Sequence, residues 1–391
     1  MKSSAAKNNL DISEKHFFEN AIAYAHSNKY GIALWKNPNA TERHVTIGNN
    51  VLFSTEDVDS NKSGFVFHPS QKETNGHLIE NQFKAKYENQ LSIEVDAISA
   101  TDDIIQGKVS GLKDTFYFNK SVSPYCEDQN DFKQYVINGI EAIKSNQFQK
   151  VVPSRSKKVE LPNNFDLVAL FLNLCNKYPN AFVSLVSTPE AGTWIGATPE
   201  VLIEVKDSTF KTVALAGTQQ YDGSASLSTI SWTQKEIEEQ ALVSRYIINC
   251  FKKIRLREFA EIGPKTIVAG NLLHLKTTFE VDMKSTNFLQ LGSVMLDLLH
   301  PTSAVCGMPQ KEANDFILKH EGNNRHYFSG FLGPVNMNGT TSLFVNLRCM
   351  QLLENVAIIY AGAGLTEDSD PEKELIETEM KMNTLLKVMN Q

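Results

Sequence analysis

Two pairs of glutamates have the spacing that a divalent-cation site needs. Glu236 and Glu239 lie three positions apart in a segment with helical periodicity, and Glu374 and Glu377 repeat this spacing near the C-terminus. Residues three apart share one side of a helix, so each pair presents two carboxylates together. Carboxylate oxygens are the hard ligands that Mg²⁺ prefers. Two such helices facing each other would form a magnesium site; otherwise the glutamates are solvated on surface helices.

The C-terminal pair belongs to a longer stretch, residues 358–381, around which the chain is organised. An apolar run ending at Tyr360 predicts a buried strand, and residues 361–364 (AGAG) are small enough for a ligand to touch the backbone. A helix should follow, because an Asp-Pro pair is typical of a helix start. On that helix Lys381 shares one sector with the two glutamates, beside an apolar stripe. We therefore expect a pocket for a cation and an anionic ligand.

Other residues capable of chemistry stand at the ends of predicted strands. Lys150 begins a strand-like run, Glu200 lies at a bend between two strands, and Arg348 ends a third. The turn at residues 216–218 could point a backbone N–H at a ligand. Each of these has an ordinary alternative: a strand-end surface lysine, a solvated carboxylate and an arginine in a surface ion pair.

Composition excludes several classes of function. The chain has 391 residues and a formal net charge of −7, with no long basic run, which argues against a nucleic-acid or anionic-membrane partner. The N-terminus has no apolar signal core, and no apolar run approaches the ~20 residues of a membrane helix. Five cysteines are scattered without a CxxC pair, which predicts buried free thiols rather than a zinc site. We expect a cytoplasmic protein.

The pattern of elements favours an α+β fold. Many strands with few regular helix alternations predict largely antiparallel sheets rather than a doubly wound fold. Long helices are expected over residues 232–253 and 286–299, and a short strand over residues 116–118. Residues 1–130 contain no constellation of chemical groups, whereas every candidate above lies within residues 131–391.

Nine segments of the chain together carry a family resemblance. In order, they are KVVPSRS, WIGATPEVLIE, LAGT, KEIEEQALV, HLKT, LHPTSAVCGMP, EGNNRHYFSGFLG, LFVNLR and AGAGLTEDSDPEKELIETEMK. They resemble the chorismate-utilising enzymes, and among these the isochorismate synthases, over about residues 148–386. The resemblance implies one α/β fold of two large, mainly antiparallel sheets packed together with helices outside. Residues 1–130 would be its variable N-terminal part and residues 131–391 its chorismate-binding catalytic region. Such enzymes are monomers or weak homodimers.

The resemblance also assigns roles to residues. Glu239 and Glu377 match direct Mg²⁺ ligands, and Glu236 and Glu374 match ligands that act through water. Lys150 matches the general base that activates water to attack C2 of chorismate, and Glu200 the general acid that protonates the departing C4 hydroxyl. The positions that match substrate-binding residues are Gly217, Thr218, His274, Ala304, Val305, Phe328, Arg348, Gly362 and Lys381. Catalysis would require a lysine pKa lowered from ~10.4 and a glutamate pKa raised from ~4.3.

A few positions discriminate among activities within the family. Ala216 stands where aminodeoxychorismate synthases carry a nucleophilic lysine, and Lys150 selects water over the ammonia of anthranilate synthase. Salicylate synthase shares the acid, base and metal ligands and remains the alternative, as does a non-catalytic binding protein. Departures from the usual pattern are Pro153, Gln219, Ser303 and Cys306. Whether the product feeds menaquinone, siderophore or salicylate synthesis stays open.

Overall fold

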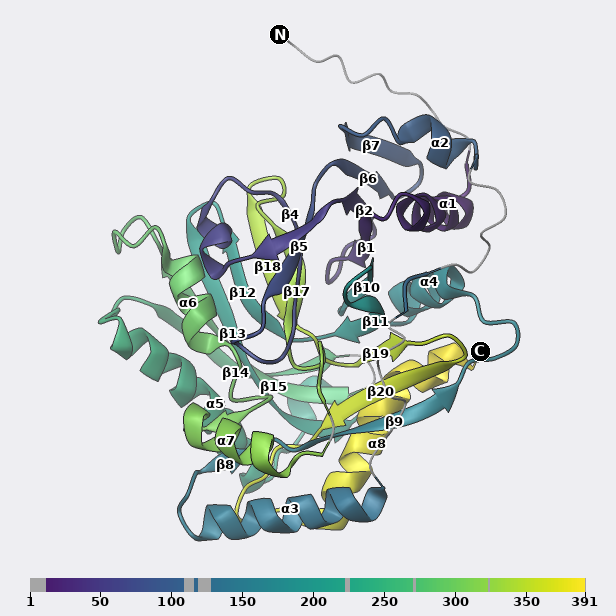
Figure 1. Ribbon diagram of the computed structural model, residues 1–391. Helices are drawn as coiled ribbons and strands as arrows, with labels where there is room; N and C mark the ends of the chain where they lie inside the picture. Colours follow the sequence, from purple (N-terminus) through teal and green to yellow (C-terminus); the bar gives the residue numbers. More distant parts are fainter. Residues whose placement is uncertain are drawn as a thin grey trace.

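The computed structural model describes residues 12–108, 116–118, 128–221, 226–269, 272–322 and 324–390, and these form two nine-stranded sheets (Figure 1). The first sheet has the spatial order β7 (Leu91–Asp96), β6 (Phe83–Tyr87), β2 (Arg43–Gly48), β1 (Gly31–Lys36), β10 (Phe182–Thr188), β11 (Gly192–Thr198), β19 (Cys349–Leu352), β20 (Val356–Gly362) and β9 (Ser154–Glu160). The second has the order β14 (Ala260–Ala269), β15 (Leu272–Asp282), β13 (Thr209–Gln220), β12 (Val201–Lys206), β18 (Thr340–Val345), β17 (Phe331–Val335), β4 (Gly64–His68), β5 (Gly76–Glu80) and β3 (Asn50–Phe53).

Every ladder between these strands is antiparallel, as the pattern of elements predicts. A separate two-stranded ladder joins β8 (Lys150–Val151) to β16 (Gly307–Met308). The expected fold class is therefore confirmed.

The two large sheets pack face to face through aromatic side chains. The rings of Phe182 on β10 and Phe344 on β18 stack with their centroids 4.0 Å apart. Trp35, Phe65 and Trp194 belong to the same buried cluster and come from both sheets. Burying large aromatic rings between two sheets supplies much of the hydrophobic stabilisation of such a fold.

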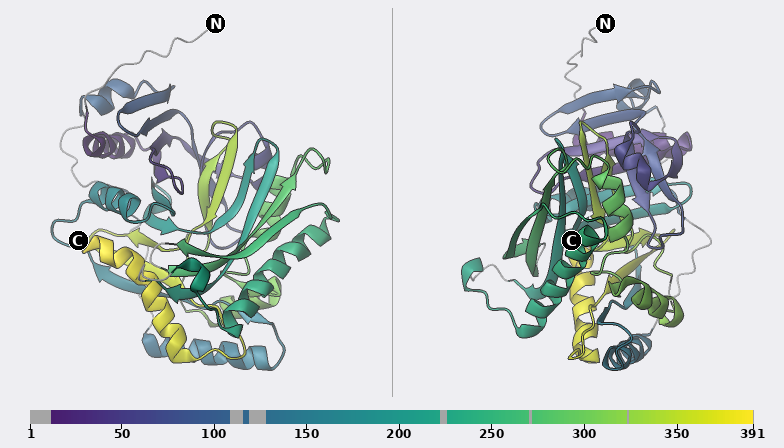
Figure 2. Two further views of the ribbon diagram at one scale, coloured as in Figure 1. Left: turned by 180° about the vertical axis from the view of Figure 1, so that it is seen from behind. Right: turned by 90° about the vertical axis from the view of Figure 1, so that its left-hand side faces the viewer.

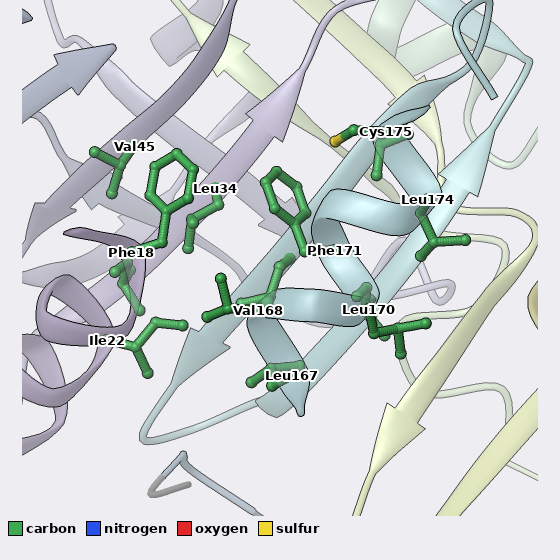
Figure 3. Packing of buried hydrophobic residues seen from close by; sticks show 14 of the residues in the cluster. Phe18, Ile22, Leu34, Val45, Leu167, Val168, Leu170, Phe171, Leu174 and Cys175 are labelled. Carbon is green, nitrogen blue, oxygen red and sulfur yellow. The ribbon is translucent and has the colours of Figure 1, made fainter. Parts of the chain in front are cut away.

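Helices cover the outer faces of both sheets (Figure 2). On the first sheet lie α1 (Glu14–Ser27), α4 (Leu167–Lys177) and α8 (Pro371–Met389), and on the second lie α5 (Gln234–Lys253) and α6 (Leu291–Leu299). The remaining helices are α2 (Thr101–Ile105), α3 (Gln129–Lys144) and α7 (Gln310–His320). Figure 3 shows Phe18 and Ile22 of α1 meeting Leu34 and Val45 of the sheet, beside Phe171 of α4. None of the described helices is long and apolar enough to cross a membrane.

The N-terminal region contributes strands to both sheets. In the first sheet β1 pairs with β10, and in the second β4 pairs with β17. The strands before residue 130 are thus built into the same two sheets as the rest of the chain. The division at residue 130 stays a prediction about where the sequence varies.

Two expected elements differ from those observed. Residues 116–118 are not a strand, because side chains satisfy their backbone: Tyr117 N–H donates to Ser187 Oγ at 3.3 Å, and Thr193 Oγ1 donates to the Tyr117 carbonyl at 2.7 Å. Helix α6 begins at Leu291 rather than at residue 286. The Asp282 carboxylate accepts hydrogen bonds from the N–H groups of the next turn, which holds that segment out of the helix.

Four of the cysteines, Cys175, Cys250, Cys306 and Cys349, are buried free thiols, as expected. Cys126 lies outside the described residues.

Candidate active site

Helices α5 and α8 place Glu374, Glu377 and Glu239 around one lysine. Lys235 on α5 extends to α8, where its Nζ lies 2.7 Å from Oε1 of the buried Glu374. Burial would lower the pKa of Lys235, but Glu374 and, more weakly, Glu377 and Glu239 outweigh burial and raise it. The contact between Lys235 and Glu374 shows that side chains of the two helices meet. Lys235 directly precedes Glu236 in the sequence but is not among the residues expected at the site.

Lys150 meets the first of these pairs. It stands on β8 with only 1% of its surface exposed, and its Nζ lies 3.0 Å from Oε1 of Glu239. Burial alone would raise the pKa of Glu239, but Lys150 and two further lysines lower it below its usual value. Glu239 is therefore ionised at neutral pH. The interpretation of Lys150 as a strand-end surface lysine is wrong.

A tight turn holds the other oxygen of Glu239. Gly217 N–H donates to Glu239 Oε2 at 3.3 Å, and the Gly217 backbone has a φ of +68°, which favours glycine. His274 Nδ1 lies 2.7 Å from the Gly217 carbonyl, so that nitrogen carries the proton. Burial is the main reason that the pKa of His274 falls to about 3, which keeps the ring neutral. Thr218 follows in β13 and is half-buried.

Glu200 is buried in the bend between β11 and β12, with 5% of its surface exposed. Its Oε1 accepts a hydrogen bond from Thr302 Oγ1 at 3.5 Å. Burial raises the pKa of Glu200 to about 7, although Lys150 and Arg348 oppose the rise. This carboxyl group can therefore hold a proton near neutral pH, which a solvated glutamate cannot do.

A small cavity of about 40 Å³ collects most of the remaining candidates. It lies where β20, the end of β18 and α8 meet. Its lining includes Ala304, Val305, Phe328, Arg348, Gly362 and Lys381. All six were singled out from the sequence, so the structure brings distant segments together as the resemblance implies. Gly217, Thr218 and His274 do not line this cavity. Gly217 is hydrogen-bonded to Glu239, and His274 is hydrogen-bonded to Gly217.

The cations of this cavity are fixed by the backbone and by α8. Lys381 Nζ donates to the Gly362 carbonyl at 2.8 Å and lies 2.7 Å from Oε1 of Glu377. Arg348 has a φ of +47°, a strained conformation that costs about 1–3 kcal/mol for a residue with a side chain. Burial lowers the pKa of Arg348, while Glu377 and Glu200 oppose the change. Lys381, Arg348 and Arg325 all line this small cavity, and positive side chains there suit an anionic ligand.

Glu236 bonds to the start of its own helix, whereas Glu239, Glu374 and Glu377 each pair with a lysine. Its Oε2 accepts a hydrogen bond of 2.8 Å from Thr233 N–H at the start of α5, which completes a capping box. The same carboxylate can therefore stabilise the helix end or act toward a cation through water.

The carboxylates suit a divalent cation in their chemistry. Within the described ranges, no three His, Cys, Asp or Glu side chains are grouped as metal ligands. Instead Glu239, Glu374 and Glu377 each pair with a lysine. Burial and then the charge of Glu377 raise the pKa of Glu374, even though Lys235 opposes them. Such repulsion between oxygen ligands is what a bound Mg²⁺ would relieve, so the donor set fits this ion.

Comparison with known proteins identifies the family. The sequence model of the family described as chorismate binding enzyme matches residues 66–390, most of the chain. The chain belongs to the chorismate-binding enzyme family. The resemblance found from the nine segments is thus confirmed.

The individual relatives share less than 30% of their residues with this chain. The chain is 29% identical over 267 residues to the isochorismate synthase EntC of Escherichia coli, covering 67% of each protein. Among solved structures, MenF, the menaquinone-specific isochorismate synthase of Escherichia coli, aligns with a TM-score of 0.77 at 19% identity, covering 97% of this chain and 92% of that one. DhbC of Bacillus anthracis, described as a 2,3-dihydroxybenzoate-specific isochorismate synthase, aligns with a TM-score of 0.73 at 24% identity, covering 95% and 99%. These structures share the fold of this chorismate-binding enzyme.

Proposed function

We propose that this chorismate-binding enzyme is a Mg²⁺-dependent isochorismate synthase. It would interconvert chorismate and isochorismate by attack of water at C2 and loss of the C4 hydroxyl. The observation that carries the proposal is the pair of titratable groups at the site: a buried lysine, Lys150, and a buried glutamate, Glu200, whose pKa is about 7. Isochorismate synthases among the relatives support the choice of reaction.

Glu200 is suited to the role of general acid. Because its pKa lies near neutrality, a substantial fraction carries a proton that can pass to the departing C4 hydroxyl. The hydrogen bond from Thr302 orients the carboxyl group. A glutamate with an ordinary pKa would be almost fully ionised and could not donate a proton at this pH.

Lys150 is suited to the role of general base. Its amine is shielded from bulk solvent, and the contact with Glu239 fixes the position of Nζ. In its neutral form this amine would take a proton from the water that attacks C2. The neighbouring Ala216 provides no second lysine for covalent attack, so water remains the nucleophile.

Arg348, Lys381 and the backbone at Gly362 would bind the carboxylates of the substrate. The positive side chains line the cavity where Ala304 and Phe328 supply apolar walls for the ring. Glu239 and Glu377 would hold Mg²⁺ directly, with Glu236 and Glu374 acting through water, and the ion would supply positive charge for the ring carboxylate. The catalytic region at residues 131–391, a cytoplasmic location and a monomer or weak homodimer are further parts of this proposal.

The direct test is to incubate the purified protein with chorismate and Mg²⁺ and to separate the products by chromatography. Isochorismate in equilibrium with chorismate, absent when EDTA is added, is the expected result. The reverse reaction from isochorismate should reach the same ratio. Salicylate together with pyruvate would instead assign the salicylate synthase activity, and unchanged chorismate would leave only a binding role.

A further inference from the structure

A buried ion pair, whose Arg325 helps to line the substrate cavity, belongs to none of the roles described above. Arg325 donates from Nε and Nη2 to the two carboxylate oxygens of Glu321, at 2.6 Å each. The Arg325 side chain is 10% exposed and that of Glu321 is 2% exposed. Both residues follow from α7, which lies beside β8 in Figure 1. This segment is one of the nine that carry the family resemblance, but neither residue is among the expected site residues.

The pair connects three segments of the active site. Arg325 Nη1 donates to the Val305 carbonyl at 2.6 Å, and Nη2 donates to the Val152 carbonyl at 2.7 Å. Glu321 accepts hydrogen bonds from Ser154 N–H at 3.0 Å and from Ser154 Oγ at 2.7 Å. Val305 belongs to the cavity wall, and Val152 lies two residues after Lys150.

The segment that carries Lys150 has little regular structure to hold it. Strand β8 is two residues long and pairs with the two-residue β16, and its Val151 forms one further bridge, to Leu365. A ladder this short is marginal without further packing. Beyond it, Ser154 begins β9 opposite Gly362 of β20. The ion pair therefore bonds to the chain at Val152 and Ser154, between the proposed base Lys150 and strand β9.

Stability alone does not explain a buried ion pair. Removing two charges from water costs several kcal/mol per ion, and apolar replacements are often as stable. Here both groups are fully engaged in a rigid fork, which fixes the three attached segments relative to one another. The contribution of the ion pair is therefore to fix the relative positions of these segments.

We propose that Glu321 and Arg325 are positioning residues for the reaction, which hold the Lys150 segment at a fixed place against the cavity wall. The inference rests on the proposed function. Because a displacement of about 1 Å at a reacting group can cost about 10²-fold in rate, loosening this pair should lower kcat. Binding of chorismate, which depends on Arg348 and Lys381, should change less than kcat, because the guanidinium of Arg325 at the cavity wall is already bonded to Glu321 and to two backbone carbonyls.

The test compares Arg325→Lys with wild type and with Lys84→Met. Arg325→Lys keeps the charge but loses the fork, whereas Lys84→Met breaks an ion pair away from the site, between the buried Lys84 on β6 and the exposed Glu94 on β7. Amide hydrogen exchange of residues 148–156 should accelerate in Arg325→Lys and not in Lys84→Met. The kcat for isochorismate formation should fall at least tenfold in Arg325→Lys, with KM changed less than threefold. Ser154→Ala, a milder change that removes one contact of Glu321, should show the same pattern with a two- to fivefold fall.

Different outcomes separate the two hypotheses. A kcat in Arg325→Lys within twofold of that in Lys84→Met would overturn the positioning role, as would a raised KM at unchanged kcat. If Arg325→Lys fails to fold, an unchanged kcat in Ser154→Ala would overturn the positioning role. Absence of isochorismate with the wild-type protein rejects the proposed function, and the exchange of residues 148–156 then tests the positioning pair without turnover: equal exchange in all variants overturns it.

Discussion

The Nζ atom of Lys150 lies 3.0 Å from Oε1 of Glu239, although the two residues are 89 positions apart in the chain. One is the proposed base and the other a proposed metal ligand. Their contact couples proton transfer at Lys150 to the cation site. A cation that binds the Glu239 carboxylate would weaken its ion pair with Lys150 and so change the electrostatic environment of the amine. It also places the Gly217 turn, which binds the second oxygen of Glu239, in the same assembly.

Lys150→Ala should abolish turnover but preserve binding. The proposed base would be absent, so we expect isochorismate formation to fall by about 10²–10⁴-fold. Stabilisation against heat by chorismate and Mg²⁺ should remain, because Arg348 and Lys381 are unchanged. The matched control is Lys133→Ala, which removes a lysine paired with Glu372 on α8 away from the cavity. A Lys150→Ala enzyme with the parental rate would show that another group activates the water.

Glu377→Gln should weaken the response to Mg²⁺. The change keeps the size of the side chain and removes a carboxylate that pairs with Lys381. We expect the Mg²⁺ concentration for half-maximal activity to rise at least tenfold. Glu372→Gln on the same helix is the control, since Glu372 is exposed and pairs with Lys133. If both variants titrate like wild type, Glu377 is no ligand.

The activity should depend on the protonation of Glu200. Burial raises the pKa of this carboxyl group to about 7, so the protonated acid disappears as the pH rises through that value. We expect kcat to fall on the alkaline side of about pH 7, and Glu200→Gln to abolish activity. A kcat that stays constant from pH 6 to pH 9 would contradict the assignment of Glu200 as the acid.

The same pKa makes a prediction about stability. A carboxyl group with a folded pKa of about 7 and an unfolded value of 4.5 stabilises the folded state fully below pH 4.5, and this stability is lost as the pH rises to about 7. The loss is on the order of 3 kcal/mol. The free energy of unfolding of Glu200→Gln relative to wild type should therefore increase between pH 4.5 and pH 7.5, as measured by urea denaturation. A pH-independent difference would mean that Glu200 ionises as in water.

Much of the site could be predicted because its residues repeat local patterns. The glutamate pairs followed from helical periodicity, and α8 begins at Pro371 after the capping Asp370 as expected. Glu236 shows the limit of such reasoning. Thr233 and Glu236 have the spacing of a capping box, and Glu236 and Glu239 have the same spacing as a pair of metal ligands. The sequence does not say which of the two uses of Glu236 prevails.

Contacts between distant segments could not be predicted in the same way. Lys235 and Arg325 act through partners 139 and 173 positions away, and no periodicity links those positions. The pKa of Glu200 likewise depends on burial by the whole fold, whereas its neighbours in the chain suggest a solvated carboxylate. Burial and long-range hydrogen bonding are set by tertiary packing, so they became visible only in the structure.

Lys235→Met should bind Mg²⁺ more tightly than wild type in the absence of substrate. The ammonium group of Lys235 lies 2.7 Å from Glu374 and is influenced by Glu377 and Glu239, so it provides the positive charge that a cation would otherwise supply. Without it, the carboxylates repel one another in the metal-free protein. We expect the melting temperature without metal to fall and the Kd for Mg²⁺, measured by calorimetry, to fall about fivefold to tenfold. Lys133→Met, which breaks the exposed pair with Glu372, should change neither quantity. Weaker Mg²⁺ binding by Lys235→Met would instead mean that Lys235 helps to hold the carboxylates in place. The loss of that ordering would then outweigh the benefit of removing a positive charge that competes with Mg²⁺.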